Sequence, residues 1–371
     1  MKKSHKRLLL FQIIIFLIIL LNSFISNALV KYNLVIFLLL ILIIFKLVFG
    51  FEKDRNRYTV DIMIEIFIVI GTSFIIYYLT GLFIGFIKIN NYFTFYGLNT
   101  FIIPIFLSII LKEFLRYNML KKSEGSKLLI ILTTILFVNI DLINYLNILT
   151  FKSVYSIFIF IALNLLPAIS NNVISSYISK KTGYKVNLVW LIVIKMYYYV
   201  LPIVPNYNDY ILSIVRIIFP FIIGYRVFTF YQNDKIIKKD LSEKNNSYVY
   251  MISIILFAGT LVYFSSGYFR FQAFSIGSGS MLPNIRIGDV VIIEKTKDIE
   301  IGDIVAYKYN NYVIVHRIVN IEKVEDELYF YSKGDANTDI DNYIIYEDMI
   351  IGEVKLKIPF IGIPSIWLSK L

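Results

Sequence analysis

The chain has 371 residues, of which 58% are hydrophobic, and its formal net charge at pH 7 is +11. The apolar share exceeds the about 45–50% of an ordinary soluble domain and is concentrated in long runs, which predicts a polytopic membrane protein. The lack of cysteine excludes disulfides, thiolate metal sites and a cysteine nucleophile. Lys and Arg lie mainly in short loops between the apolar runs, a pattern typical of membrane topology and not of nucleic-acid binding.

Apolar runs long enough to cross a membrane follow one another up to residue 267. A helix needs about 20 such residues to cross about 30 Å of hydrocarbon. The first run follows a Lys- and Arg-rich start, as in a signal peptide, but it exceeds the roughly 7–15 residues of a signal-peptide core, so we expect it to be retained. We predict about nine spans, at 8–29, 33–50, 61–86, 97–114, 128–148, 154–178, 187–204, 209–231 and 248–267.

The charges of the loops predict the topology. With the amino terminus in the cytoplasm, only Lys31, Lys88 and Lys152 fall in outside loops, in line with the positive-inside rule. An odd number of spans places everything after the last one outside the cell. We therefore expect a multi-pass protein of the cell membrane in which residues 1–247 form a membrane domain of unknown role and residues 248–267 form the last span.

Ionisable side chains also fall within the predicted spans, namely Glu65, Asp141, Lys195 and Arg216. Charges at membrane depth are costly and often mark pathways or pairs. Because these four form no regular array, we expect interhelical ion pairs or side chains that reach the interface, and not a proton relay.

The composition changes sharply after Tyr268. Short runs alternate apolar and polar residues and are separated by Gly-Asp turns, which predicts a small, mostly β domain over residues 268–371. The expected strands are 272–275, 290–294, 304–309, 313–319, 328–332 and 351–357.

A Gly/Ser turn begins this domain. Glycines on both sides of Ser278 allow backbone angles closed to other residues, and such a turn can present the Ser280 hydroxyl and a neighbouring N–H to one point. A serine nucleophile needs a base. The chain has two histidines, and the predicted topology places His5 inside, which leaves His316 on an apolar strand face. The alternatives are an ordinary linker and a structural histidine.

The acidic loop after the fifth expected strand could orient an imidazole. It offers three carboxylates, Asp335, Asp339 and Asp341. Its start also matches a calcium-binding loop, but Ile340 stands where that loop needs glycine and Tyr346 where it needs glutamate, so we expect neither a metal nor another cofactor. A solvated acidic turn is the alternative.

The order of these motifs resembles type I signal peptidases, in particular the archaeal and endoplasmic-reticulum branch. The resemblance implies that Ser280 is the nucleophile, that His316 is the general base and that Asp341 is the acid of the triad. It also gives Asp335 a supporting role and Ser278 a role in the oxyanion hole. The matching segments are Ser278-Gly279-Ser280-Met281-Leu282-Pro283, Gly288-Asp289, Gly302-Asp303-Ile304-Val305, Val315-His316-Arg317, Lys333-Gly334-Asp335-Ala336-Asn337, Gly352, Ile358-Pro359 and Gly362.

The resemblance covers only the last quarter to third of the chain. It implies a membrane-bound serine endopeptidase that removes signal peptides from exported precursors, in contact with the lipid bilayer and either alone or within a membrane complex. Members of this branch usually carry one amino-terminal anchor, so the first eight spans have no match. Two alternatives are a membrane scaffold or transporter whose outer β domain binds a partner without catalysis, and a protease that uses Lys308 or Lys333 as its base.

Overall fold

The computed structural model describes residues 2–25, 31–56, 58–89, 92–146, 153–232, 241–267, 269–310, 312–325 and 327–363. The predicted ends of the first and fifth spans, 26–29 and 147–148, lie outside these residues, as does Lys152. The chain divides into two compact units. The first comprises residues 1–73, 89–201 and 207–255, and the second comprises residues 74–88, 202–206 and 256–371.

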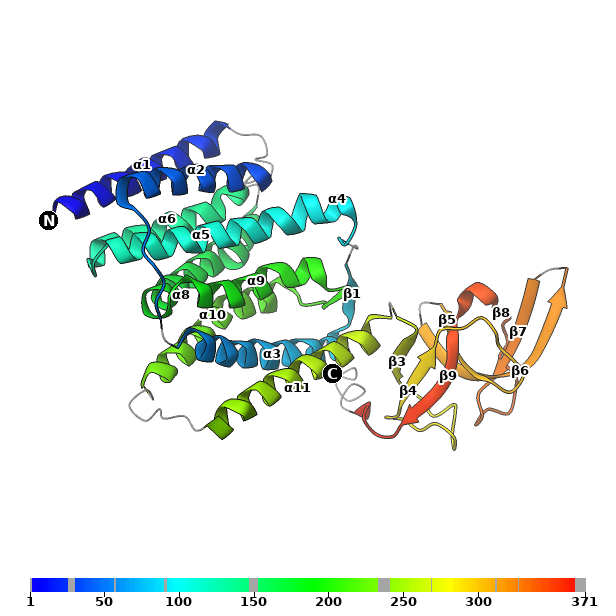
Figure 1. The fold of residues 1–371 in the computed structure, drawn as a ribbon. Helices are drawn as coiled ribbons and strands as arrows, with labels where there is room; N and C mark the ends of the chain where they lie inside the picture. Colours follow the sequence, from blue (N-terminus) through cyan, green and yellow to red (C-terminus); the bar gives the residue numbers. More distant parts are fainter. Residues whose placement is uncertain are drawn as a thin grey trace. The chain divides into compact units, whose positions relative to one another are not determined.

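The first unit is helical (Figure 1). Two of its long helices contain a π-helical segment, so that α4 continues through η1 into α5 and α7 continues through η2 into α8. The described helices up to Ser266 are α1 (Lys3–Ile25), α2 (Lys31–Phe49), α3 (Thr59–Ile84), α4 (Phe95–Gly97), η1 (Leu98–Ile102), α5 (Ile103–Lys122), α6 (Lys127–Leu146), α7 (Val154–Ile159), η2 (Phe160–Leu165), α8 (Leu166–Thr182), α9 (Tyr184–Val200), α10 (Asp209–Gln232) and α11 (Leu241–Ser266).

The helices pack around two apolar clusters. One joins α1, α2, α5 and α6 around Phe45 and Phe137, and the other joins α3, α5, α8, α9 and α10 around Trp190. Large apolar side chains also cover the outer faces; Leu47 is 80% exposed and Leu256 is 65% exposed. Exposed apolar area of this extent on helices is typical of contact with lipid.

The helices match the predicted spans in position, but the predicted count of nine is not supported. Six helices in the described part of the chain are long and apolar enough to cross a membrane. They are Tyr32–Phe49, Thr59–Gly81, Phe95–Lys122, Val154–Thr182, Asp209–Gln232 and Ser247–Ser266. The helix α9 is one of the predicted spans outside this set, and its 17 residues lie at the short end of the range for a crossing.

Most of the ionisable residues within the predicted spans are paired, as expected. The Asp141 carboxylate lies 2.6 Å from the Lys112 ammonium and 3.2 Å from that of Lys195. Glu65 pairs with Arg226 at 2.5 Å. The first set of contacts joins α5, α6 and α9, and the second joins α3 and α10, so both are interhelical ion pairs. Pairing reduces the free-energy cost of placing a charged side chain within an apolar bundle.

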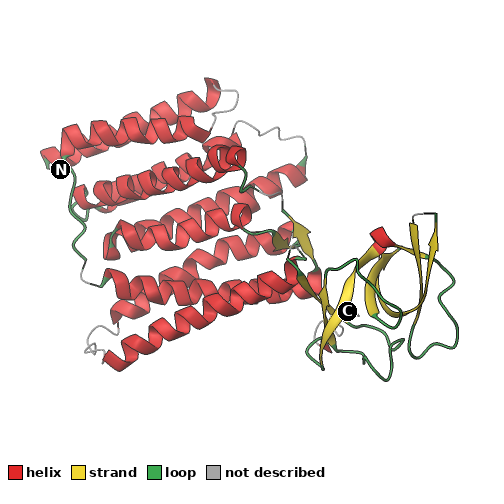
Figure 2. Ribbon diagram, turned by 45° about the vertical axis from the view of Figure 1, so that its right-hand side comes forward, coloured by secondary structure: helices red, strands yellow, loops and turns green. Residues whose placement is uncertain are grey.

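The second unit contains a seven-stranded antiparallel sheet in the order β3-β4-β9-β5-β6-β7-β8. Figure 2 shows the strands in yellow, all but two of them in this sheet. The predicted strands are confirmed in position, and the two-residue β8 is an addition. The sheet strands are β3 (Phe271–Ser275), β4 (Val290–Glu294), β5 (Ile304–Tyr309), β6 (Tyr312–Val324), β7 (Glu327–Lys333), β8 (Ile345–Tyr346) and β9 (Ile350–Ile358), and the outlying pair is β1 (Phe86–Lys88) with β2 (Ile203–Pro205).

Alternation along the strands gives the sheet two apolar faces. Val315 of β6 belongs to a cluster with Met281 and Val291, whereas Ile318 belongs to a second cluster with Tyr307 and Phe330. His316 lies between these positions on β6 and is 7% exposed. The sheet therefore holds the imidazole in a fixed and nearly dry position.

Candidate active site

Ser280 lies in the loop between β3 and β4, and this loop is held by its own turns and by a second loop. The Leu282 N–H donates to the Gly279 carbonyl at 3.1 Å, and the buried Met281 side chain anchors the turn in the core of the sheet. The Ser280 carbonyl accepts a hydrogen bond from the Ala336 N–H at 2.8 Å. A Cβ at Gly334 would lie 2.7 Å from that carbonyl oxygen, so glycine permits the close approach of the two loops.

Three of the predicted site residues form a continuous chain of hydrogen bonds. The Ser280 Oγ lies 3.1 Å from the His316 Nε2, and the His316 Nδ1 lies 2.7 Å from the Asp341 Oδ2. With Asp341 ionised, Nδ1 carries the imidazole proton and Nε2 is left to accept the Ser280 proton. This is the geometry that allows a serine hydroxyl to become a nucleophile.

The backbone positions Asp341 through β7. Its N–H donates to the Ser332 carbonyl at 2.9 Å, which folds the loop after β7 back toward β6. The side-chain hydroxyl of Ser332 donates to the Asp341 Oδ2 at 2.5 Å. Asp341 is therefore held both by its own backbone and by a neighbouring strand, in reach of the buried imidazole.

A tyrosine pair completes the surroundings of Asp341. The Tyr307 hydroxyl lies 3.3 Å from the Asp341 Oδ2 and 2.9 Å from the hydroxyls of both Ser332 and Tyr343. Burial raises the pKa of Tyr307 and of Tyr343, so both remain protonated and able to donate. The ring of Tyr343 also stacks on that of Tyr309, with centroids 3.9 Å apart.

The sequence prediction missed Ser332, Tyr307 and Tyr343. The one available signal was the position of Tyr307 on the inner, apolar side of a predicted strand. A buried tyrosine hydroxyl needs a partner, and this requirement points to a polar group nearby.

Asp335 does not reach His316 or Ser280. Its carboxylate accepts two hydrogen bonds from Arg317, both of 2.8 Å, and one of 2.7 Å from the Asn284 amide. The hydrogen bonds from Arg317 hold the pKa of Asp335 below its ordinary value. Asn284 follows Ser280 in its loop and Arg317 follows His316 on β6, so Asp335 ties together the two segments that carry the serine and the imidazole.

Ser278 lies beside the candidate nucleophile, with its Oγ 3.3 Å from the Ser280 Oγ. Both hydroxyls therefore face the same point. The basic group that hydrogen-bonds to the Ser280 hydroxyl is the His316 imidazole, and among the described residues neither Lys308 nor Lys333 makes such a bond. Among the residues that the structure describes, no three His, Asp or Glu side chains gather to hold a metal ion.

A serine, a histidine and an aspartate hydrogen-bonded in this order on a β domain have the arrangement of a serine peptidase site. Residues 269–355 match the Peptidase S24-like family model. The same part of the chain is similar to curated signal peptidases, which confirms the resemblance and its confinement to the carboxyl-terminal region.

Three of these relatives illustrate the extent of the similarity. Signal peptidase I W of Bacillus subtilis is 30% identical over 86 residues, which are 22% of this chain and 45% of the relative. The signal peptidase complex catalytic subunit SEC11 of Plasmodium falciparum is 33% identical over 103 residues, 25% of this chain and 56% of the relative. SEC11 of Colletotrichum graminicola is 36% identical over 108 residues, 25% of this chain and 61% of the relative. The chain thus spans about half of the length of the curated relatives that it matches.

Proposed function

We propose that this protein is a membrane-bound serine endopeptidase that removes signal peptides from exported precursor proteins. The observation that carries the proposal is the hydrogen-bonded chain of Ser280, His316 and Asp341. The similarity of the same region to signal peptidases supports the choice of substrate.

The proposed reaction begins with attack of the Ser280 Oγ on the scissile carbonyl carbon, while the His316 Nε2 takes the hydroxyl proton. The Asp341 carboxylate stabilises the imidazolium. The imidazolium then gives its proton to the leaving amine, and an acyl-enzyme remains on Ser280. Water attacks the acyl-enzyme with the same imidazole as base, which releases the signal peptide and restores the serine.

The negative oxygen of the tetrahedral intermediates needs donors. In the proposed site the Ser278 hydroxyl and the Ser280 N–H supply them. One such donor is worth about 2.7–4 kcal/mol of the barrier in other serine proteases.

The substrate is proposed to bind as an extended strand. The strand β3 lies at one end of the seven-stranded sheet and leads directly into the loop of Ser278 and Ser280. An edge strand offers unpaired backbone groups to a peptide, and the peptide gains main-chain hydrogen bonds beside the nucleophile. The resemblance implies small side chains at the first and third positions before the cut.

The proposed location is the cell membrane, with the amino terminus in the cytoplasm and the β domain outside. The loop charges and the apolar helices support this topology. A signal peptide that has crossed the membrane would then present its cleavage site on the side of Ser280. Some relatives are named as catalytic subunits of a complex, so association with other membrane proteins is part of the proposal.

The test is cleavage of a signal-peptide-bearing precursor by the purified full-length protein in detergent or vesicles. We expect Ser280→Ala and His316→Ala to abolish cleavage while their unfolding temperatures stay near that of the wild type. Tyr312→Phe is the matched control, because it removes an exposed hydroxyl from the same sheet and leaves the triad intact. Wild-type cleavage by Ser280→Ala would refute the proposal and favour the alternative of a partner-binding β domain.

A further inference from the structure

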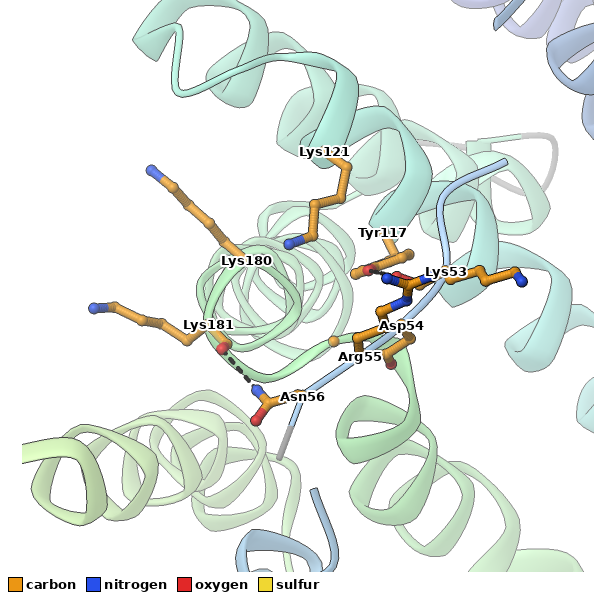
Figure 3. A pocket seen from close by; sticks show the side chains of 9 residues that line it. Lys53, Asp54, Arg55, Asn56, Tyr117, Lys121, Lys180 and Lys181 are labelled. Carbon is orange, nitrogen blue, oxygen red and sulfur yellow. Dashed lines mark hydrogen bonds between the residues drawn. The ribbon is translucent and has the colours of Figure 1, made fainter. Parts of the chain in front are cut away.

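A basic cavity of about 180 Å³ lies within the first unit, where several helices end. Its lining comes from the segment between α2 and α3, from the end of α5 and from the end of α8 (Figure 3). These helices belong to four of the six candidate spans, and a site at the ends of spans lies at a membrane–water interface. The lining residues are Lys53, Asp54, Arg55, Asn56, Tyr117, Lys121, Lys180, Lys181 and Gly183.

Positive charge dominates this lining. Five of its nine residues are Lys or Arg and one is acidic. None of the five cations forms an ion pair with an acidic side chain of the described residues. Instead, the Lys121 ammonium lies 5.6 Å from the Tyr117 ring and that of Lys181 lies 6.0 Å from the Tyr231 ring. The cavity therefore concentrates positive potential, which favours an anion.

Hydrogen bonds hold the walls of the cavity together. The Tyr117 hydroxyl donates to the Lys53 carbonyl at 3.1 Å, and the Asn56 amide donates to the Lys181 carbonyl at 3.0 Å (Figure 3). The Glu52 N–H, next to Lys53 in the same segment, donates to the Asn118 side chain of α5 at 2.8 Å. The segment between α2 and α3 is thus fixed to both α5 and α8, so the cavity is formed before any ligand arrives.

Asp54 gives the cavity a hydrogen-bond acceptor in addition to its positive charges. Its Oδ2 is buried and has no hydrogen-bond partner among the described residues. A Cβ at Gly183 would lie 2.2 Å from this oxygen, and the φ of Gly183 is +94°, so glycine makes room for the carboxylate. Asp54 itself is part of the lining, so its carboxylate can accept a hydrogen bond from a hydroxyl or an ammonium group of a ligand.

We propose that this cavity binds a phosphate ester that also carries a hydrogen-bond donor, and that its source is the headgroup of an anionic glycerophospholipid. The phosphate would contact Lys121, Lys180 and their neighbours, and a headgroup hydroxyl would donate to Asp54. The excess of cations favours a ligand with net negative charge over a zwitterionic one. By the predicted topology the lipid belongs to the cytoplasmic leaflet, where anionic headgroups attract basic pockets between spans.

The test measures lipid binding to delipidated full-length protein in detergent by native mass spectrometry. The probes are phosphatidylglycerol, phosphatidylmethanol and phosphatidylcholine with identical acyl chains. Phosphatidylmethanol has the charge of phosphatidylglycerol without its hydroxyls. We expect phosphatidylglycerol to bind most tightly, and Asp54→Ala to abolish its advantage over phosphatidylmethanol.

A pair of double variants separates the cavity from general surface charge. Lys121→Gln with Lys180→Gln removes two lining cations, whereas Lys127→Gln with Lys185→Gln removes two exposed cations outside the lining, at the starts of α6 and α9, which are predicted to face the same side. We expect the first pair to weaken phosphatidylglycerol binding about 10- to 30-fold, since each basic residue near an anionic surface contributes about 1 kcal/mol. The second pair should leave binding within about twofold.

Equal losses in the two double variants would overturn the proposal, and so would equal binding of phosphatidylglycerol and phosphatidylcholine by the wild type. Glycerol 3-phosphate and inorganic phosphate distinguish the source. If neither displaces the lipid, the headgroup is the ligand. If glycerol 3-phosphate displaces it at comparable concentration and the cavity variants lose this effect, the same site is assigned to a soluble phosphate ester.

Discussion

Asp341→Asn and Asp335→Asn should affect different properties of the protein. Asp341→Asn should mainly lower kcat, whereas Asp335→Asn should mainly lower the free energy of unfolding. Asp341 touches the imidazole, with its Oδ2 2.7 Å from the His316 Nδ1, whereas Asp335 touches Arg317 and Asn284. An asparagine at 341 no longer fixes the imidazole tautomer that leaves Nε2 free to accept a proton. The same substitution in the triad of another serine protease lowers kcat about 10⁴-fold, and we expect a loss of that order here.

Asp335→Asn should instead lower the free energy of unfolding. It weakens two charge-assisted hydrogen bonds from Arg317, each of a type that contributes about 1.5–3 kcal/mol. The Arg317 side chain is 32% exposed, so water replaces part of this loss, and the asparagine can still accept one bond. We estimate a net cost of about 2 kcal/mol, with kcat lowered less than about tenfold at temperatures where the variant is folded.

The assay combines steady-state cleavage of a signal-peptide substrate with thermal unfolding of the same full-length preparations. The double variant gives a further check. Because the two carboxylates share no partner, their effects on the free energies should add within about 0.5 kcal/mol. A large loss of kcat in Asp335→Asn, together with near-normal turnover in Asp341→Asn, would refute the assignment of the acid.

Three further predictions concern the surroundings of the triad. Ser332→Ala removes a donor to the Asp341 carboxylate and should lower kcat about 10- to 100-fold with little change in KM, measured by steady-state kinetics. Ser278→Ala should lower kcat about a hundredfold or more if its hydroxyl serves the oxyanion, whereas a wild-type rate would remove it from the site. The third concerns acid stability. The lowered pKa of Asp335 means that its contribution is present above the unfolded value of about 3.8 and is lost as the pH falls through the lower folded value. The free energy of unfolding of the wild type should therefore fall more steeply below about pH 4 than that of Asp335→Asn, and parallel curves would contradict this.

The strands could be predicted, and Ser280 proposed as the nucleophile, because both signals are local. Alternation along β4, β5 and β7 is visible in the residues themselves. The expected glycine-only backbone angles beside Ser278 are not found, because neither Gly277 nor Gly279 has a positive φ. His316 could be found because the chain has only two histidines. Asp341 needed the resemblance, since three aspartates stand in one loop and their order along the chain does not decide which of them turns inward.

The contacts behind Asp341 could not be predicted, because they depend on pairing between distant strands. Val305 of β5 lies opposite His316, and this register places Tyr307 two residues further along the same face. Ser332 joins them from β7, on the other side of β6. Three strands must be aligned before these hydroxyls meet, and a shift of one residue in either pairing would turn them to the other face.

The predicted count of nine spans is not supported among the described residues, for a different reason. Hydropathy alone treats each apolar run as a crossing, whereas a bundle can hold helices that are shielded by others. α9 is an example, with Trp190 fully buried and Asn187 donating to the carboxylate of Glu113 on α5. Most of α9 therefore packs on other helices, although Tyr198 and Val200 near its end are exposed.

The interior of the first unit holds a polar network that apolar anchoring does not require. An anchor needs only apolar length, whereas Glu113 and Arg116 are fully buried on α5 and paired with each other. Arg116 also donates to the Asn172 side chain of α8 at 2.5 Å, and the Asn172 amide donates to Asp141 of α6 at 2.9 Å. Buried charges of this kind add little net stability compared with apolar side chains, but removing one partner is costly because the other charge is left unpaired. The network therefore fixes one arrangement of α5, α6 and α8, and a fixed arrangement is what a preformed cavity at the ends of α5 and α8 requires.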